Sequence, residues 1–468
     1  MDVPNSRLLR IGKIVSEGQV PKEKRGGFRR AAMFEAKKEA VRNFLGKLNC
    51  VESHYGRAKS KRVYVAAELS VSKLHKLFKA QATSSLHVSY SCFHNIFIND
   101  FNIGFSSPAT DACASCTRLR TQIAQNPEGS PERVTLMTEL RLHKLRADAF
   151  YKIMKETAGI TDTYSFVFDL QQVHPLPKTP IGDAFYRRQI SFYSFCCVPV
   201  DSRAPTFYTW NETMGKRGAN EIGSALIHHL RSQDLSSFST ISMFSDGCAG
   251  QNRNAHVVHV LCHWLKNESR ENIQKIQVTF PTRGHSFLPA DRAFGRVEKR
   301  LKNINVITNN NEYDAIYEEF GSVKKLGEDW VVYDIKHLEQ IYQKIKGISQ
   351  TKRLCIKKIR SRDGTVSTKV LCCANYRFDS MTENFRSIVK KGRSDSLENL
   401  PEIHTSLALT EEKKRDVIHL LKTHFGADWR DQPNLTWYAN VLENAADPST
   451  EEDEECDCLE EEPQCIHI

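Results

Sequence analysis

The chain has 468 residues, of which 40% are hydrophobic and 26% are charged, a composition typical of a globular protein with roughly two to four domains. No run approaches the roughly 18 apolar residues of a membrane span, and residues 1–6 lack the apolar stretch of a secretory signal, so we expect a nuclear or cytoplasmic protein. The 14 cysteines are scattered along the chain, which favours thiols or metal ligands over a disulfide framework.

The net charge of +10 is unevenly distributed. Residues 1–90 hold 19 Lys and Arg against 7 acids, and residues 443–468 hold 11 acids with no Lys or Arg. The basic end suits a surface that follows phosphates, and we expect the acidic tail to be disordered. The alternative is that both ends are simply solvated.

The N-terminal 90 residues predict a small basic, α-rich module. Residues 22–30 form a basic arm, residues 34–45 have helical spacing, and residues 71–80 form a second helix for which Ser72 is a plausible cap. A short strand is expected after Arg62, following the basic turn at 53–62. The module is either a helix-turn-helix-like DNA reader or a packing domain.

Residues 91–160 predict a Cys/His element with long helices. Cys113 and Cys116 have the spacing of half a structural zinc site, and His143 on a helix from about 131 to 158 is a third candidate ligand. Two packed thiols and a core histidine are the alternative, and a redox pair is disfavoured because no thioredoxin-like βαβ pattern surrounds it. The candidates for a fourth ligand are His94, Cys92 and Asp111.

Residues 161–305 predict the centre of the fold, a mixed α/β core. Strands are expected at 164–170, 189–200, 206–210, 240–244 and 276–280, and helices at 218–231, 252–264 and 289–301. The order βββαβαβα, with an early hairpin, is that of the ribonuclease-H-like fold. Residues 306–442 form a smaller α+β addition, with a basic hairpin around 361–364 and a helix at 410–425.

Two carboxylates end hydrophobic runs of this core. Asp169 ends Phe166-Val-Phe-Asp, and Asp246 follows Ile241-Ser-Met-Phe-Ser. If these strands are neighbours, both acids reach one sheet edge, where carboxylates can hold a pair of Mg²⁺ or Mn²⁺ ions for phosphodiester chemistry. Each acid taken singly also fits a turn or a helix cap.

The third acid has two candidates on one helix. Asp291 lies in the first turn, and Glu298 follows two turns later on the same face. We favour Asp291, although it also fits a plain helix-start residue and Glu298 a surface acid. His285 is expected to contact the scissile phosphate or to orient a carboxylate. The arginines that could hold the nucleic-acid backbone are Arg217, Arg253, Arg292 and Arg296.

These motifs together resemble a family of transposon-derived, transposase-like proteins. The segments that carry the resemblance are Asp111-x-Cys113-x-x-Cys116, Phe168-Asp-Leu-Gln-Gln172, Ser245-Asp-Gly-Cys-Ala-Gly-Gln-Asn252 and Gly284-His-Ser…Asp291…Glu298. The resemblance runs from about residue 24 to residue 437. It implies a ribonuclease-H-like core with Asp169, Asp246 and Asp291 as catalytic acids, Glu298 as a fourth, and a Zn²⁺-stabilised element around the cysteine pair. It also implies DNA as the partner, and further DNA-binding material ahead of residue 24 in longer relatives.

Three functions compete at this stage. The first is a transposase-like enzyme that cuts and joins DNA, as a homo-oligomer if it joins two ends. The second is a nuclease with the same core and no strand transfer. The third is a domesticated, catalytically inactive DNA- or chromatin-binding protein, for which the basic arm, the Cys/His element and the acidic tail would suffice.

Overall fold

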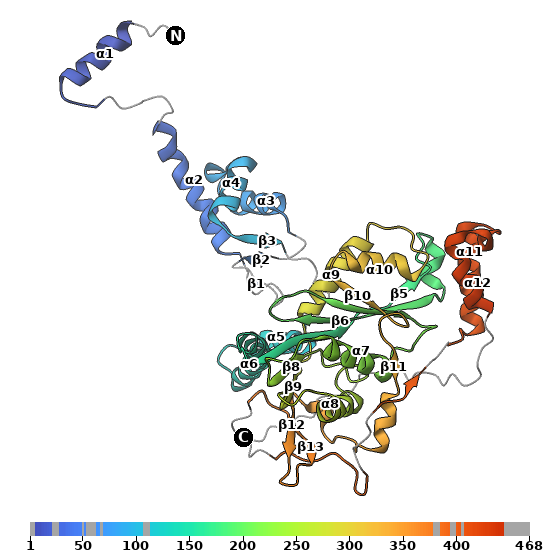
Figure 1. The fold of residues 1–468 in the computed structure, drawn as a ribbon. Helices are drawn as coiled ribbons and strands as arrows, with labels where there is room; N and C mark the ends of the chain where they lie inside the picture. The colour runs from blue at the N-terminus through green and yellow to red at the C-terminus, as the bar shows by residue number, and fades with distance from the viewer. Residues whose placement is uncertain are drawn as a thin grey trace. The chain divides into compact units, whose positions relative to one another are not determined.

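The computed structural model separates the chain into two compact units, residues 1–112 and 113–468 (Figure 1). The structure describes residues 5–20, 28–48, 51–52, 62–65, 69–105, 113–377, 384–393, 399–403 and 407–443. Residues 22–27 of the predicted arm, residues 53–61 of the basic turn and the acidic tail after residue 443 lie outside these ranges.

The N-terminal unit combines helices with a small three-stranded sheet. Its elements are α1 (Asn5–Ser16), α2 (Phe28–Gly46), β1 (Val51–Glu52), β2 (Val63–Val65), α3 (Val71–Gln81), a 3-10 turn (Ser84–Leu86), α4 (Tyr90–Asp100) and β3 (Ile103–Phe105). The buried side chains of Val41, Phe78 and Phe93 join α2, α3 and α4 in one core. Because α4 and β3 belong to this core, the packed unit continues past residue 90, where the sequence placed a boundary.

The cap of α3 corrects one expectation. Ser70 begins the helix, and its Oγ accepts a hydrogen bond from the Lys73 amide at 3.2 Å. Ser72 lies inside the first turn instead. A serine hydroxyl can satisfy an amide that has no partner within the helix only from the position just before the helix, and Ser70 occupies that position.

The C-terminal unit is built on a nine-stranded mixed sheet. Its order is β10-β7-β6-β4-β8-β9-β12-β13, and β5 pairs with β6. The strands are β4 (Thr163–Leu170), β5 (His174–Leu176), β6 (Ile190–Pro199), β7 (Thr206–Asn211), β8 (Thr240–Phe244), β9 (Lys275–Thr279), β10 (Ser322–Lys325), β12 (Arg353–Arg360) and β13 (Val366–Cys373), with β11 (Val332–Tyr333) and β14 (Glu402–Ile403) paired separately. The predicted α/β class, with a mixed sheet, is confirmed.

The sheet has antiparallel and parallel sections. β6 is antiparallel to both β4 and β7, whereas β4, β8 and β9 run parallel to one another. Parallel neighbours require helical crossovers, which α7 and α8 supply. As a result, the carboxyl ends of β4 and β8 lie at the same edge of the sheet.

Helices cover both faces of this sheet (Figure 1). The helices of the unit are α5 (Ala114–Gln125), α6 (Pro131–Thr157), α7 (Ala219–Ser232), α8 (Ala255–Asn267), α9 (Pro289–Leu301), α10 (Asn310–Glu318), α11 (Glu411–Phe425) and α12 (Thr436–Glu443), with 3-10 turns at Gly182–Tyr186, Ile335–Gln340, Ile348–Gln350, Trp429–Asp431 and Pro433–Leu435. Among the strand residues that alternate between faces, Phe166 and Phe168 pack with α7 and α8, and Val167 packs with α9. Asp169 therefore projects on the α9 side.

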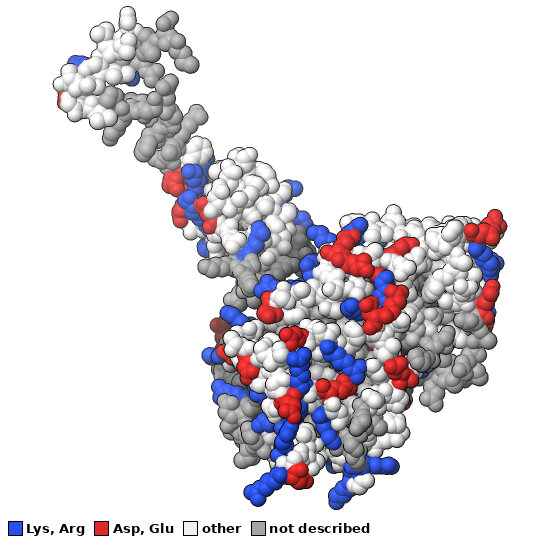
Figure 2. All heavy atoms as spheres, viewed as in Figure 1, with Lys and Arg blue, Asp and Glu red and all other residues white. Residues whose placement is uncertain are grey.

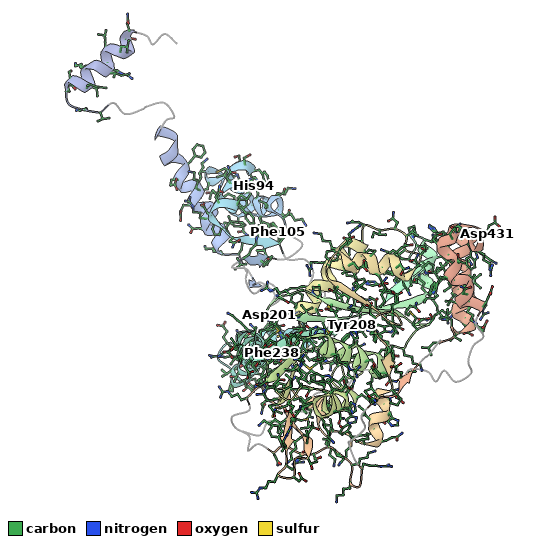
Figure 3. All side chains as sticks on the ribbon, in the orientation of Figure 1. His94, Phe105, Asp201, Tyr208, Phe238 and Asp431 are labelled. Atoms are coloured by element: carbon green, nitrogen blue, oxygen red, sulfur yellow. The ribbon has the colours of Figure 1, made fainter. Side chains whose placement is uncertain are left out.

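Two histidines of α7 contact tyrosine hydroxyls of the sheet. Tyr208 on β7 is labelled in Figure 3. Its hydroxyl lies 3.1 Å from Nδ1 of His228 on α7. The hydroxyl of Tyr164 lies 3.0 Å from Nε2 of His229, whose pKa burial lowers to about 3. His229 is therefore a neutral member of the core at physiological pH.

The elements predicted between residues 161 and 305 are confirmed to within a few residues. The basic hairpin is confirmed as β12–β13, around which Figure 2 shows Lys and Arg side chains. β5 was not predicted, and neither was the pairing of β12 with β9 or of β10 with β7. The two strands of each pair are distant in sequence, so no local sequence pattern predicts their pairing. In the described part of the chain, no helix is both long enough and apolar enough to cross a bilayer.

Candidate metal-binding sites

The structure brings Asp169 and Asp246 to one edge of the sheet. Val167 on β4 aligns with Phe244 on β8, and each aspartate lies two residues beyond its member of that pair. Because the two strands are parallel neighbours, the same offset carries both carboxylates to the same height. This is the convergence that the two hydrophobic runs predicted.

Asn252 bridges the two carboxylates. Its Nδ2 donates to Asp246 Oδ1 at 2.6 Å and lies 3.3 Å from Asp169 Oδ1. The amide of Cys248 also donates to Asp246 Oδ1, at 3.2 Å. Asn252 is fully buried, and its Oδ1 has no hydrogen-bond partner. An oxygen left without a partner beside two carboxylates suits a bound cation or an ordered water.

Asp291 contributes a third negative charge to this edge. The pKa of the Asp169 carboxyl is raised well above its usual range, first by burial and then by the charges of Asp246 and Asp291. Asp291 also accepts a hydrogen bond from the Leu288 amide at 2.6 Å, which fixes it at the start of α9. All three acids retain some solvent exposure, so an ion can reach them from solution.

Glu298 lies in a neighbouring polar group. Its Oε1 accepts from Gln171 Nε2 at 3.0 Å and lies 3.6 Å from His174 Nε2. Asp169 and Gln171 lie on the same face of the strand. Asp291 and Glu298 lie on the same face of α9. The strand end and the helix therefore face each other at two positions. Asp291 is thus within electrostatic range of Asp169, and Glu298 contacts Gln171.

The cysteine pair belongs to a second cluster, which has four members. Cys113, Cys116, His143 and His285 each offer one ligand atom, and these atoms lie within 4.8 Å of one another. Cys113 Sγ lies 3.3 Å from His143 Nε2, and Cys116 Sγ lies 3.3 Å from His285 Nε2. Two sulfurs and two imidazole nitrogens at this separation match the ligand set of a tetrahedral zinc site.

His285 corrects the sequence-based assignment. The sequence suggested that it contacts the scissile phosphate or orients a carboxylate, whereas its Nε2 lies 3.0 Å from His143 Nε2 in the Cys/His cluster. Of the earlier candidates for a fourth ligand, Cys92 and His94 lie in the N-terminal unit and Asp111 lies outside the described residues. The sequence contains one indication that His285 approaches the cysteines, which is the glycine directly before it, Gly284.

Gly284 allows the loop to approach the cysteines. Its φ of +76° is in the left-handed region, and a Cβ at this position would lie 2.8 Å from both Cβ and Sγ of Cys113. Only glycine combines this backbone conformation with so close an approach. The hydroxyl of Tyr151 on α6 also donates to the His285 carbonyl at 2.9 Å, which holds the loop against the helix.

The four arginines that the sequence suggested as contacts of the nucleic-acid backbone have different surroundings in the structure. Arg253 lies next to Gly247, and its Nε is buried without a hydrogen-bond partner. Burial lowers the pKa of its guanidinium, and the negative charge of Asp246 opposes that shift. When the Gln251 amide is oriented with its oxygen toward Arg217, Arg217 donates two hydrogen bonds to that oxygen, at 3.0 and 3.2 Å. The other two arginines lie over aromatic rings: Arg292 over Phe287 at 5.4 Å, and Arg296 over Phe320 at 5.6 Å. Arg253 is therefore the arginine best placed to meet a phosphate at the acidic edge.

Comparison with known proteins gives little further guidance. A domain of unknown function (DUF7869) matches residues 199–373, a segment that includes Asp246, His285, Asp291 and Glu298. No curated protein matches the chain. One solved structure, titled "Crystal structure of NurA with manganese", is similar at 11% identity and a TM-score of 0.15 over 68% of this chain and 66% of that chain. A TM-score this low carries no argument about fold or activity.

Proposed function

We propose that residues 163–301 cleave phosphodiester bonds in nucleic acid with divalent cations held by Asp169, Asp246 and Asp291. The observation that carries the proposal is the single Asn252 amide that contacts both aspartates beside a third acid. Three carboxylates crowded together repel one another, and ordinary folding gains nothing from the arrangement. A pair of Mg²⁺ or Mn²⁺ ions would relieve the repulsion.

Asp169, Asp246 and Asp291 would hold the ions, which would supply activation of a water or a 3′-hydroxyl and stabilisation of the leaving oxygen. The protein's own residues hold the geometry. Asn252 and the Cys248 amide fix Asp246, the strand end fixes Asp169, and the first turn of α9 fixes Asp291. Arg253 supplies a positive charge next to this edge, where the phosphate of a bound strand would lie.

The order of the strands supports a ribonuclease-H-like core for this activity. Three antiparallel strands, β7-β6-β4, continue into β8 and β9, both parallel to β4. The resemblance to transposon-derived proteins adds a finer proposal, in which the cleaved 3′-end is transferred to a second DNA. Transfer and simple hydrolysis would use the same acids and differ in the attacking hydroxyl.

We further propose Zn²⁺ as the ion of the Cys113, Cys116, His143 and His285 cluster. The donor set fits, because thiolate and imidazole ligands favour zinc over magnesium or calcium. Four protein ligands leave no open position, which is typical of a structural site rather than a catalytic one. Zinc here would therefore hold the fold and leave the chemistry to the acidic edge.

Cleavage of labelled DNA by the full chain in Mg²⁺ or Mn²⁺ tests the main proposal. Asp169→Asn, Asp246→Asn and Asp291→Asn should each lower the rate by at least about 10³-fold, since each removes a charge on which transition-state stabilisation depends. Glu298→Gln should cost less, because Glu298 contacts Gln171 and His174 instead. Lys346→Gln on the far side of the sheet serves as a control. If the wild-type chain binds DNA and Mn²⁺ yet never cleaves, the enzymatic proposal fails and the protein is a binding protein.

A further inference from the structure

The loop between β5 and β6 presents two aromatic rings to solvent. Phe185 is 87% exposed and Tyr186 is 83% exposed, and their ring centroids lie 5.2 Å apart. The other exposed aromatic side chains among the described residues, Phe34 and Tyr90, are only 43% and 45% exposed. Two adjacent rings this far out of the core contribute almost nothing to folding, so their presence requires another explanation.

The backbone that carries these rings is firmly held. Asp416 on α11 pairs with Arg187 at 3.1 Å and with Arg188 at 3.3 Å, and it also accepts from the Arg188 amide at 3.2 Å. Asp183, at the other side of the rings, contacts His419 on α11 at 2.8 Å and Arg187 at 3.3 Å. The rings therefore project from an anchored turn, Gly182–Tyr186, and not from a free loop.

The position of this turn relates it to the acidic edge. Asp169 lies opposite Cys196 on β6, and β6 begins at Ile190, which pairs with Leu176 on β5. The β5–β6 ribbon therefore extends about 20 Å beyond Asp169, at 3.3 Å per residue, before the turn is reached. A nucleic-acid strand several nucleotides long would span this distance.

The chemistry of the turn favours nucleic acid as its partner. The turn and its anchor on α11 hold three cations, Lys178, Arg187 and Arg188, against two acids, Asp183 and Asp416, which leaves a net charge of +1. Flat rings beside guanidinium groups are the surface on which unpaired bases stack, because every base has a π-face and every phosphate a negative charge. A protein partner would also accept exposed aromatic rings, but it would gain nothing from the proximity of the acidic edge.

We propose that Phe185 and Tyr186 form a stacking platform for unpaired bases of the nucleic acid that is bound at the acidic edge. This inference rests on the proposed function and adds the form of its substrate, a strand with single-stranded or unpaired bases several nucleotides from the reacting phosphate. The adjacent cations, above all the well-exposed Arg188, assist by attracting the backbone.

Fluorescence anisotropy with the full chain tests the platform. The probes are a labelled single-stranded 20-mer DNA and the same sequence as a blunt duplex, in buffer without added Mg²⁺ or Mn²⁺. Phe185→Ala with Tyr186→Ala should weaken single-strand binding by about tenfold or more. Duplex binding should change by less than about threefold, because paired bases are stacked already and phosphate contacts are intact.

Two controls make the result specific. Tyr186→Phe keeps the ring and should bind single strands like the wild type. Ile160→Ala removes another exposed apolar side chain, 52% exposed and at the opposite end of β4, and should change neither affinity. The dependence of affinity on salt should be unchanged in all of these variants, since none of them alters a charge.

Unchanged single-strand affinity in the double alanine variant would overturn the platform. So would light scattering that shows a dimer of the wild type and a monomer of the variant with equal DNA affinity, because the rings would then form a protein interface. Cleavage assays separate this result from the larger proposal. A wild-type chain that cleaves DNA while the variant binds normally refutes only the platform. A wild-type chain that binds single strands through the rings but never cleaves in Mg²⁺ or Mn²⁺ refutes only the proposed chemistry.

Discussion

Asp169 carries an electrostatic cost in the folded protein. Burial and two neighbouring carboxylates raise its pKa, so its ionised form is unfavourable in the metal-free protein. Such conflict is tolerated where it serves a ligand, since natural sequences retain local strain at functional sites.

Asp169→Asn should therefore raise the stability of the metal-free protein. At a pH above the raised pKa of Asp169, the substitution removes one of the mutually repelling charges, and we expect a gain on the order of 1–3 kcal/mol in the free energy of unfolding. Chemical denaturation without divalent cations measures it. Addition of Mn²⁺ should stabilise the wild type more than the variant. The difference in the free energy of unfolding between the two proteins should then become smaller or change sign. A variant less stable than the wild type in the absence of metal would show that Asp169 is a structural residue.

The same carboxyl makes metal binding depend on pH. Because the folded pKa of Asp169 lies above the unfolded value, its contribution to stability is present at low pH and is lost as the pH rises through the folded pKa. A cation binds the ionised form, so Mn²⁺ affinity should rise over the same interval. Titration of Mn²⁺ by electron paramagnetic resonance at several pH values measures this slope. The slope should be reduced in Asp169→Asn, and an equal slope in both proteins would assign the titration to another group.

At the scale of elements, one loop serves both clusters. The segment between β9 and α9 carries His285 to the Cys/His cluster and, six residues later, Asp291 to the acidic edge. A metal bound to His285 would tie this segment to α5 and α6, because the other three ligands lie there. The Cys/His site would thereby act on the acidic edge through the covalent chain.

His285→Ala should remove one Zn²⁺ per chain and should weaken Mn²⁺ binding at the acidic edge by about 10- to 100-fold, the usual cost of losing a supporting interaction of a metal site. Zinc content by mass spectrometry and hydrogen exchange of residues 281–288 are the readouts. Cys92→Ala and His94→Ala, which alter the candidates from the N-terminal unit, should retain full zinc content. Loss of zinc with unchanged Mn²⁺ affinity would show that the two clusters are independent.

At the scale of the molecule, the two units have separate cores. The N-terminal core uses residues between Val41 and Ile103, and the larger cores of the C-terminal unit use residues between Phe150 and Leu442. No residue of either set is shared among the described side chains. Each unit therefore has the apolar interior that an independently folding domain requires.

A chain that begins at about residue 107 should accordingly fold, bind zinc and retain the acidic edge. Its DNA affinity should fall, and so should the dependence of that affinity on salt, because residues 1–90 hold an excess of 12 positive charges over negative ones. Thermal unfolding and anisotropy titrations at several salt concentrations measure both properties. A shortened chain with an unchanged salt dependence would place the nucleic-acid contacts entirely in the C-terminal unit.

Local patterns were enough for the elements and for part of each cluster. Alternating apolar residues and turn signals predicted the strands and helices from 161 to 305, because one face of each is buried. The ends of two hydrophobic runs marked Asp169 and Asp246, and the cysteine spacing marked Cys113 and Cys116. These features are short-range, since each depends only on neighbours within a few residues.

Contacts between distant segments required the folded chain. The place of β12 beside β9, the position of His285 at the cysteines and the electrostatic influence of Asp291 on Asp169 all join residues that are far apart in sequence. Strand pairing and helix packing determine these contacts. The hydrophobic pattern of one strand is compatible with several neighbouring strands, so the pattern alone does not select the partner. The anchored turn with Phe185 and Tyr186 is of the same kind, because in the sequence two aromatic residues beside two arginines do not reveal whether they are buried or exposed.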